Sequence, residues 1–205
     1  SNVPLYGDMS SRVMNILSSY TPNIEIYSID EAFLEFKGFQ EYDLEAYCKE
    51  IQKKVLKWTG IPISIGIAPT KALAKVANRI SKKFPKKTKG VYVIKSEKNR
   101  IKALKWLEVE NVWGIGFRHA KRLRSFEINN AHDFVSLPDD WVRKQMSVVG
   151  LRLKKELEGE SVLYLEENRS PKKAIATTRS FEGTITDFEK IKERVSTFAV
   201  CCAEK

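Results

Sequence analysis

The stretch IPISIGIAPTKALAK, residues 61–75, decides the fold, because an apolar run passes directly into a helical pattern. Its first part, IPISIGIA at 61–68, is rich in isoleucine and is typical of a buried strand. A helix is predicted to follow over residues 70–84. Its buried side would carry Leu73, Val76, Ala77, Ile80 and Phe84, which keep the helical period.

Strands and helices alternate on both sides of this stretch. A strand is predicted over residues 25–36, a helix over 42–58 and a further strand, GVYVIK, over 90–95. The order βαβαβ predicts a small sheet with helices packed on one face. Before it, Asp8 is predicted to cap a helix that ends near Pro22.

The remaining sequence predicts further units. Residues 107–163 change to short helices separated by glycine, asparagine and proline, which indicates a compact helical unit. EENRSPKK, residues 166–173, is polar and is typical of a linker. Residues 174–183 suggest a strand, and apolar residues between Phe188 and Cys202 mark a helix that still continues at the last residue. Since one strand and one helix cannot bury a core alone, we expect the chain to be cut there.

The net charge of +10 is concentrated in one part of the chain. Residues 71–105 carry 13 of the 36 basic side chains and one of the 26 acidic ones, so a polyanion is a natural partner for this block. The alternative is a solvated lysine-rich face. No apolar run reaches the roughly 20 residues of a membrane span, and we expect a cytoplasmic protein. The three cysteines form no CxxC pair, which argues against a zinc site or a disulfide framework.

Two adjacent acids, Asp30 and Glu31, interrupt the apolar stretch YSIDEAFLEF at residues 27–36. Neighbours on a strand point to opposite faces, so these carboxylates could converge only near a strand end or a turn. There they could hold Mg²⁺, which prefers oxygen ligands, and two such ions can support phosphoryl transfer. The alternative is a pair of exposed charges at a strand end.

Two lysines, Lys71 and Lys75, share one face at the start of the helix predicted over residues 70–84. Because the backbone amides of a helix start attract phosphate, a triphosphate is a plausible ligand. The alternative is that these lysines only solvate an ordinary helix.

A tight glycine turn lies within VENVWGIGFRHAKRL, residues 109–123. Glycines permit close approach of a backbone, and the helix that follows offers free amides beside basic side chains. This arrangement is typical of a helix-hairpin-helix, which binds a nucleic-acid backbone without reading its sequence. The alternative is a simple helical turn. The candidate DNA-binding residues are Gly114, Ile115, Gly116, Lys121, Arg122 and Arg124.

At this point the sequence resembles the Y-family translesion DNA polymerases, and within them the UmuC-type catalytic subunits. YSIDEAFLEF resembles the palm motif whose acids bind the catalytic metal, here Asp30 and Glu31. GIAPTKALAK, residues 66–75, resembles the palm motif whose last lysine, here Lys75, contacts the triphosphate of the incoming nucleotide. VWGIGFRHAKRL, residues 112–123, is similar to the thumb hairpin, and SPKKAIATTRSF, residues 170–181, to the tether that enters the little finger.

The resemblance implies an α+β chain with a partial palm at 1–105, a helical thumb at 106–165, a linker at 166–173 and the start of a little finger at 174–205. It implies an error-prone, DNA-directed DNA polymerase of the SOS response to DNA damage, which adds deoxynucleotides to a primer with two Mg²⁺ ions. The implied partners are primer–template DNA, a deoxynucleoside triphosphate and a UmuD-type accessory subunit, and no membrane. The implied location is the bacterial cytoplasm, in association with the nucleoid.

The sequence also departs from the family pattern. The first metal-binding Asp of the family, the aromatic residue that excludes ribonucleotides, and the fingers domain are not found before Tyr27. We therefore expect a fragment that is itself inactive. One rival is a non-catalytic DNA-binding module that uses the helix-hairpin-helix. A nucleotide cyclase of related palm topology is another, but it gives the hairpin no role.

Overall fold

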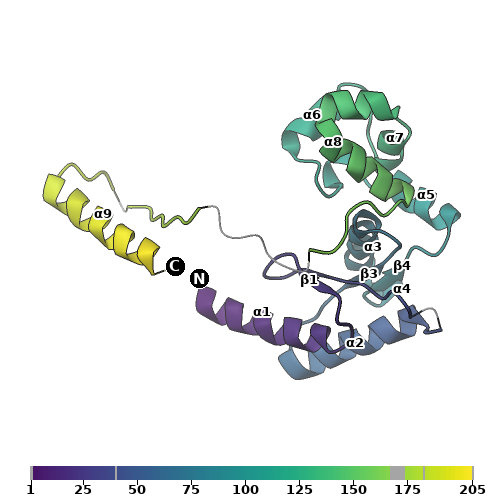
Figure 1. The fold of residues 1–205 in the computed structure, drawn as a ribbon, viewed down its shortest axis with the longest axis horizontal. Helices are drawn as coiled ribbons and strands as arrows, with labels where there is room; N and C mark the ends of the chain where they lie inside the picture. Colours follow the sequence, from purple (N-terminus) through teal and green to yellow (C-terminus); the bar gives the residue numbers. More distant parts are fainter. Residues whose placement is uncertain (1, 40, 167–173, 182, 205) are drawn as a thin grey trace. The chain divides into compact units, whose positions relative to one another are not determined.

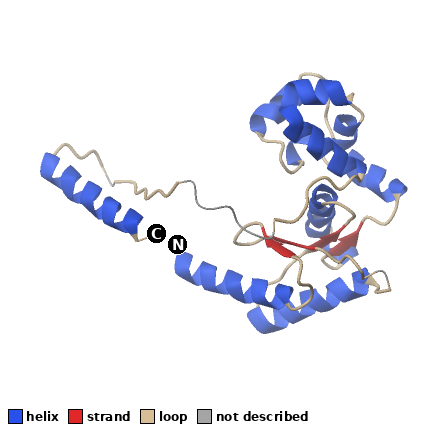
Figure 2. Ribbon diagram, viewed as in Figure 1, coloured by secondary structure: helices blue, strands red, loops and turns tan. Residues whose placement is uncertain are grey.

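The structure is a computed structural model of the 205-residue chain, and it describes residues 2–39, 41–166, 174–181 and 183–204. The chain forms two compact units, Ser1–Glu167 and Asn168–Lys205, which are treated separately below (Figure 1). Helices predominate over short strands in the first unit (Figure 2). The expected α+β class is confirmed.

The amino-terminal part of the first unit contains all the strands of the described residues. In chain order its elements are α1 Val3–Ser18, β1 Ile24–Ile26, β2 Ala32–Leu34, α2 Leu44–Thr59, β3 Ile65–Ile67, α3 Lys71–Lys83, α4 Pro85–Thr88 and β4 Val91–Val93. β1 pairs antiparallel with β2, and β3 pairs parallel with β4. These pairs make two separate two-stranded sheets.

The single strand predicted over residues 25–36 is wrong. The chain instead turns back on itself, and the amides of Tyr27 and Ser28 both donate to the Glu31 carbonyl at 3.0 Å. The βαβαβ order is therefore wrong as well, because a hairpin replaces its first strand. The Ser28 hydroxyl stabilises the turn by donating to the Asp30 carboxylate at 2.6 Å, a local bond that competes with a continuous strand.

The start of the first helix also differs from its prediction. Asn2 caps α1, its side-chain oxygen accepting from the Leu5 amide at 3.2 Å, and a proline stands in the first turn. Asp8 lies inside the helix and pairs with Arg12 at 2.9 Å. The predicted cap at Asp8 is wrong because Asn2 and Pro4 together supply an earlier start signal.

The helices that flank β3 are confirmed. Asp43 caps α2, and Gly60 ends it in the left-handed region with φ of +73°. Thr70 caps α3 by accepting from the Leu73 amide at 3.3 Å. The buried stripe of α3 matches the predicted one except at its end, where Phe84 is partly exposed.

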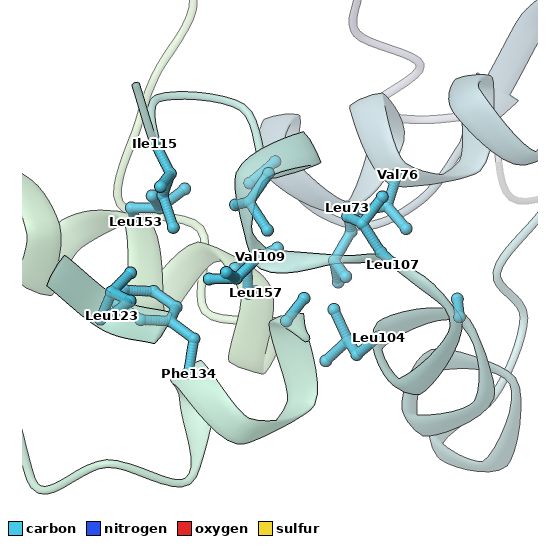
Figure 3. Close-up of a cluster of buried hydrophobic side chains, with 14 of the residues drawn as sticks. Leu73, Val76, Leu104, Leu107, Val109, Ile115, Leu123, Phe134, Leu153 and Leu157 are labelled. Carbon is cyan, nitrogen blue, oxygen red and sulfur yellow. The ribbon is translucent and has the colours of Figure 1, made fainter. Parts of the chain in front are cut away.

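The carboxyl-terminal part of the first unit is the predicted bundle of short helices. It contains α5 Glu97–Trp106, a 3-10 turn Val109–Asn111, α6 Phe117–Arg124, α7 Ala131–Val135 and α8 Asp139–Glu158. Its core is continuous with the inner face of α3. Figure 3 shows Leu73 and Val76 of α3 beside Leu104 and Leu107, with Phe134 and Leu157 in the same cluster. The helix that carries Lys71 and Lys75 is thus fixed to the bundle by hydrophobic burial.

A second core joins α1 and α2 to the strands, and Cys48 lies within it. Its side chain is 1% exposed, and burial raises the pKa of the thiol to about 12. Because only a thiolate reacts rapidly, we expect iodoacetamide to modify the half-buried Cys201 and Cys202 in the native protein and to spare Cys48 until the chain unfolds. Mass spectrometry of timed samples checks this, and early loss of the Cys48 thiol would contradict it.

In the second unit, α9 Phe188–Ala203 is confirmed. The strand predicted over 174–183 is wrong for the residues that the structure describes there, which form no strand. A strand forms only beside another strand, and the described residues of this unit contain no second strand. Apart from Glu166, the predicted linker lies outside the described residues. None of the helices in the described ranges has the length and apolar character to cross a bilayer.

Candidate functional site

The turn between β1 and β2 presents the two predicted acids. Asp30 is exposed, and its carboxylate accepts from Ser28. Glu31 is half-buried, and its Oε1 accepts from Lys75 Nζ at 2.6 Å. Neighbouring side chains on a strand point to opposite faces, but side chains at a turn do not have to. The carboxylates of Asp30 and Glu31 can therefore converge here.

The acids and lysines line one cavity of about 970 Å³. Asp30 and Glu31 enter from the hairpin, and Lys71 and Lys75 enter from the first two turns of α3. The sequence suggested the acids and the lysines as two separate candidate groups, on segments that are well separated along the chain. The structure brings them together.

The two lysines differ in their surroundings. Lys71 Nζ donates to Glu25 Oε2 at 2.7 Å and to the Tyr164 carbonyl at 3.3 Å, and it lies over the Phe33 ring. Its side chain is 13% exposed, so this ammonium is held by the protein itself. Lys75 has one carboxylate partner, Glu31, and it lies 5.6 Å from the Tyr27 ring centroid. Lys75 is therefore the better placed of the two to exchange its partner for a phosphate.

A cation at this turn would draw on Asp30 and Glu31. Groups of three or more acidic, histidine or cysteine side chains that could hold a metal are absent from the described ranges. The two carboxylates fit a hard cation that completes its shell with water, since Mg²⁺ usually keeps several waters. Lys75 already pairs with Glu31 Oε1, so its ammonium would compete with the cation for this carboxylate.

This competition leads to a prediction for Lys75→Met. We expect Mn²⁺ to bind about fivefold more tightly to this variant, because a half-buried ion pair worth about 1 kcal/mol no longer occupies Glu31. Isothermal titration with MnCl₂ measures the change. Lys83→Met removes the same charge from an exposed position of α3 and serves as the control. Equal affinities for the two variants would contradict the prediction.

An aromatic cluster joins the acid hairpin to the helical bundle. Trp113 Nε1 donates to the Tyr27 hydroxyl at 3.1 Å, and the rings of Tyr27, Phe33 and Trp113 lie with centroids 5.7 Å apart. Trp113 immediately precedes the predicted glycine turn. Sequence reasoning missed this contact, whose only signal was a tryptophan beside two glycines.

The glycine turn joins the 3-10 turn Val109–Asn111 to α6. Gly114 adopts φ of +86°, a conformation that favours glycine. The Ile115 side chain is buried, and the Ile115 amide donates to the Val112 carbonyl at 3.0 Å. Neither this side chain nor this amide is therefore available to a ligand. Gly116 is the exposed N-cap of α6 and provides no capping side chain, which leaves amides of the first turn open.

The three basic candidates of α6 are exposed but not equivalent. Arg122 donates to the Gln145 carbonyl at 3.1 Å, and Arg124 pairs with Glu110 at 2.8 Å. Lys121 makes no ion pair with the described residues. Of these three candidates it is therefore the one most available to a phosphate.

A buried carboxylate, Glu156, fixes the start of α3 to the end of α8. It is fully buried, and its two oxygens accept from the amides of Ala72, Val162 and Leu163 at 3.1, 2.8 and 2.9 Å. Its backbone carbonyl accepts from the Thr70 hydroxyl at 2.6 Å. Sequence reasoning missed this residue because an isolated glutamate in a charged helix carries no signal.

The segment that carries this site is similar in sequence to known proteins. The impB/mucB/samB family matches residues 1–79, which include the acid hairpin, Lys71 and Lys75. Protein UmuC of Salmonella typhimurium is 42% identical over all of this chain and 49% of its own length. The chain is thus similar, in residues 1–79, to the impB/mucB/samB family. The resemblance to UmuC-type polymerases is thereby confirmed.

Proteins named as DNA polymerases are also similar to this chain, both in sequence and in structure. DNA polymerase IV 1 of Halalkalibacterium halodurans is 32% identical over 74% of this chain and 36% of its own length. The solved insertion ternary complex of Dbh DNA polymerase superposes with a TM-score of 0.65 at 29% identity, over 80% of this chain and 47% of that one. The chain spans about half the length of the curated UmuC relative that it matches.

Proposed function

We propose that this chain is part of a template-directed, error-prone translesion DNA polymerase that acts in the SOS response. The observation that carries the proposal is the cavity shared by Asp30, Glu31 and Lys75, within the segment that matches the impB/mucB/samB family. The relatives named DNA polymerase IV and the Dbh DNA polymerase complex support the reaction class.

In this mechanism Asp30 and Glu31 would hold Mg²⁺, and the ion would supply charge stabilisation for phosphoryl transfer. Lys75 moves from Glu31 to the triphosphate of the deoxynucleotide and balances its charge. Lys71, held by Glu25, contributes positive charge from a fixed position. The helical hairpin positions the duplex through the backbone amides at the first turn of α6 and through the side chains of Lys121, Arg122 and Arg124. Gly114 and Gly116 allow the DNA backbone to approach closely, and the buried Ile115 anchors the turn.

The partners follow from the same proposal. Primer–template DNA and a deoxynucleoside triphosphate are its substrates, and a UmuD-type accessory subunit is expected from the family alone. The domain limits at 105 and 165, a cytoplasmic location and association with the nucleoid belong to the proposal too.

Primer extension tests the function. We expect this chain alone to add no nucleotides, because its described residues provide two metal-binding acids and not three. The complete protein should extend a primer in the presence of Mg²⁺, and Asp30→Asn should slow it at least about a hundredfold, since charge stabilisation at the reacting phosphate is lost. Asp8→Asn, an exposed change in α1, is the control. Robust extension by this chain alone would contradict its expected inactivity, and robust extension by the Asp30 variant of the complete protein would refute the proposed role of Asp30.

A second candidate is a DNA-binding module without catalysis. The closed Glu31–Lys75 pair favours it, because a neutralised carboxylate needs no cation. Metal titration separates the two functions. The polymerase requires Mn²⁺ binding that Asp30→Asn abolishes, whereas the module predicts no effect of this substitution.

A further inference from the structure

A lysine-rich surface with two aromatic side chains lies where α3 and α5 end. Phe84 and Trp106 are in contact, with ring centroids 5.5 Å apart, although they belong to separate helical segments. They are 36% and 37% exposed. We name this the lysine–aromatic surface, and it consists of Lys83, Phe84, Lys86, Lys87, Lys102, Lys105 and Trp106.

The charges of this surface are not neutralised within the protein. All five lysines are exposed, and none makes an ion pair with the described residues. Lys86 and Lys87 follow Phe84 on α4, and Lys102 lies one turn before Trp106 on α5. Some other lysines of the first unit are compensated, since Glu45 pairs with both Lys49 and Lys95. Cations without an ion-pair partner around exposed aromatic rings favour an anionic ligand whose planar rings can stack on the aromatic side chains.

A cationic row connects this surface with the candidate active site. Lys75, Arg79 and Lys82 follow one another along a face of α3 and line a small cavity of about 260 Å³ together with Glu31. Lys83 and Phe84 follow directly. The positive charge therefore extends along the helix, which suits a chain of phosphates better than a single small anion.

We propose that the lysine–aromatic surface binds a single-stranded polynucleotide, with bases stacked on Trp106 and Phe84 and phosphates beside the lysines. A duplex keeps its bases within the helix, so it could use the lysines but not the rings. This site is separate from the glycine turn of the helical hairpin and goes beyond the proposed polymerase reaction. It would exist whether or not that reaction is confirmed.

The experiment measures fluorescence anisotropy of a short labelled oligothymidylate and of an abasic oligonucleotide with the same number of phosphates. We expect the protein to bind the thymidylate at least about tenfold more tightly, because each stacked base contributes on this order. Trp106→Leu should remove this difference while preserving an apolar contact with Phe84. Lys86→Glu with Lys87→Glu should weaken both ligands and reduce the salt slope by about 1.4, for two lost phosphate contacts.

The matched control is Lys53→Glu with Lys57→Glu, which makes the same charge change at two exposed positions of α2. A duplex of the same sequence should show no response to Trp106→Leu. Three results would overturn the proposal. The first is equal affinity of the unaltered protein for the thymidylate and abasic strands. The second is an equal loss of oligonucleotide affinity in the test and control lysine variants. The third is binding to phosphatidylserine vesicles through these lysines without binding to the oligothymidylate.

Discussion

Gly66→Ala is expected to lower the free energy of unfolding by about 3 kcal/mol or more, because β3 and α3 cross at this residue without room for a methyl group. A Cβ atom at Gly66 would overlap the Asn78 amide nitrogen and the Ala74 carbonyl oxygen, and it would lie 2.7 Å from the Ala77 carbonyl carbon. All three atoms belong to the backbone of α3. No side-chain rotamer can relieve such a clash, so the helix itself must move away from the strand.

Urea denaturation followed by circular dichroism measures this loss. Gly7→Ala is the matched control, since Gly7 lies inside α1 with no heavy atom within 4 Å of an added Cβ. That substitution should stabilise the protein by about 0.5–1 kcal/mol, as alanine does in a helix interior. If Gly66→Ala and the unaltered protein had the same free energy of unfolding, β3 could not pack on α3 as closely as the structure shows.

The regularity that made β3 and α3 predictable is local. Isoleucines at short spacing, a threonine cap and a helical apolar stripe all lie within one short segment, and the structure reproduces them. The same reasoning failed at residues 25–36 because the turn has no glycine or proline to mark it. Ser28 and Asp30 form it through side-chain bonds that apolar periodicity does not register.

The candidate site likewise contains residues that a local motif reveals and supporting residues that it does not. Asp30, Glu31, Lys71 and Lys75 stand in recognisable motifs, so they could be selected as candidates from residue type, spacing and the family resemblance, and the structure places all four along one cavity. Their supports could not. Glu25 meets Lys71 across 46 positions, Trp113 meets Tyr27 across 86, and Glu156 meets Ala72 across 84. Contacts of this range depend on how whole elements pack, and no single segment encodes them.

Glu156→Leu is expected to lower the free energy of unfolding by about 4 kcal/mol, because leucine approximates the volume of the side chain but removes both of its acceptor oxygens. The amides of Ala72, Val162 and Leu163 then have no acceptor in a buried setting. Each buried unsatisfied donor costs about 1–3 kcal/mol, part of which relaxation of residues 160–165 recovers. The carboxylate also lies at the amino terminus of α3, where negative charge is favourable.

Two further variants separate hydrogen bonding from general damage to α8. Glu156→Gln retains one acceptor oxygen but presents an NH₂ group where the second oxygen stood, so its loss of stability should be intermediate between those of the unaltered protein and the leucine variant. Glu160→Leu changes an exposed side chain whose nearest cation, Lys155, is 3.9 Å away, and it should alter stability by less than about 0.5 kcal/mol. Urea midpoints that are the same for Glu156→Leu and Glu160→Leu would show that the buried carboxylate does not hold α3 to α8. Hydrogen exchange localises the effect, since the amides of Val162 and Leu163 should lose protection in Glu156→Leu before those of the helix interiors do.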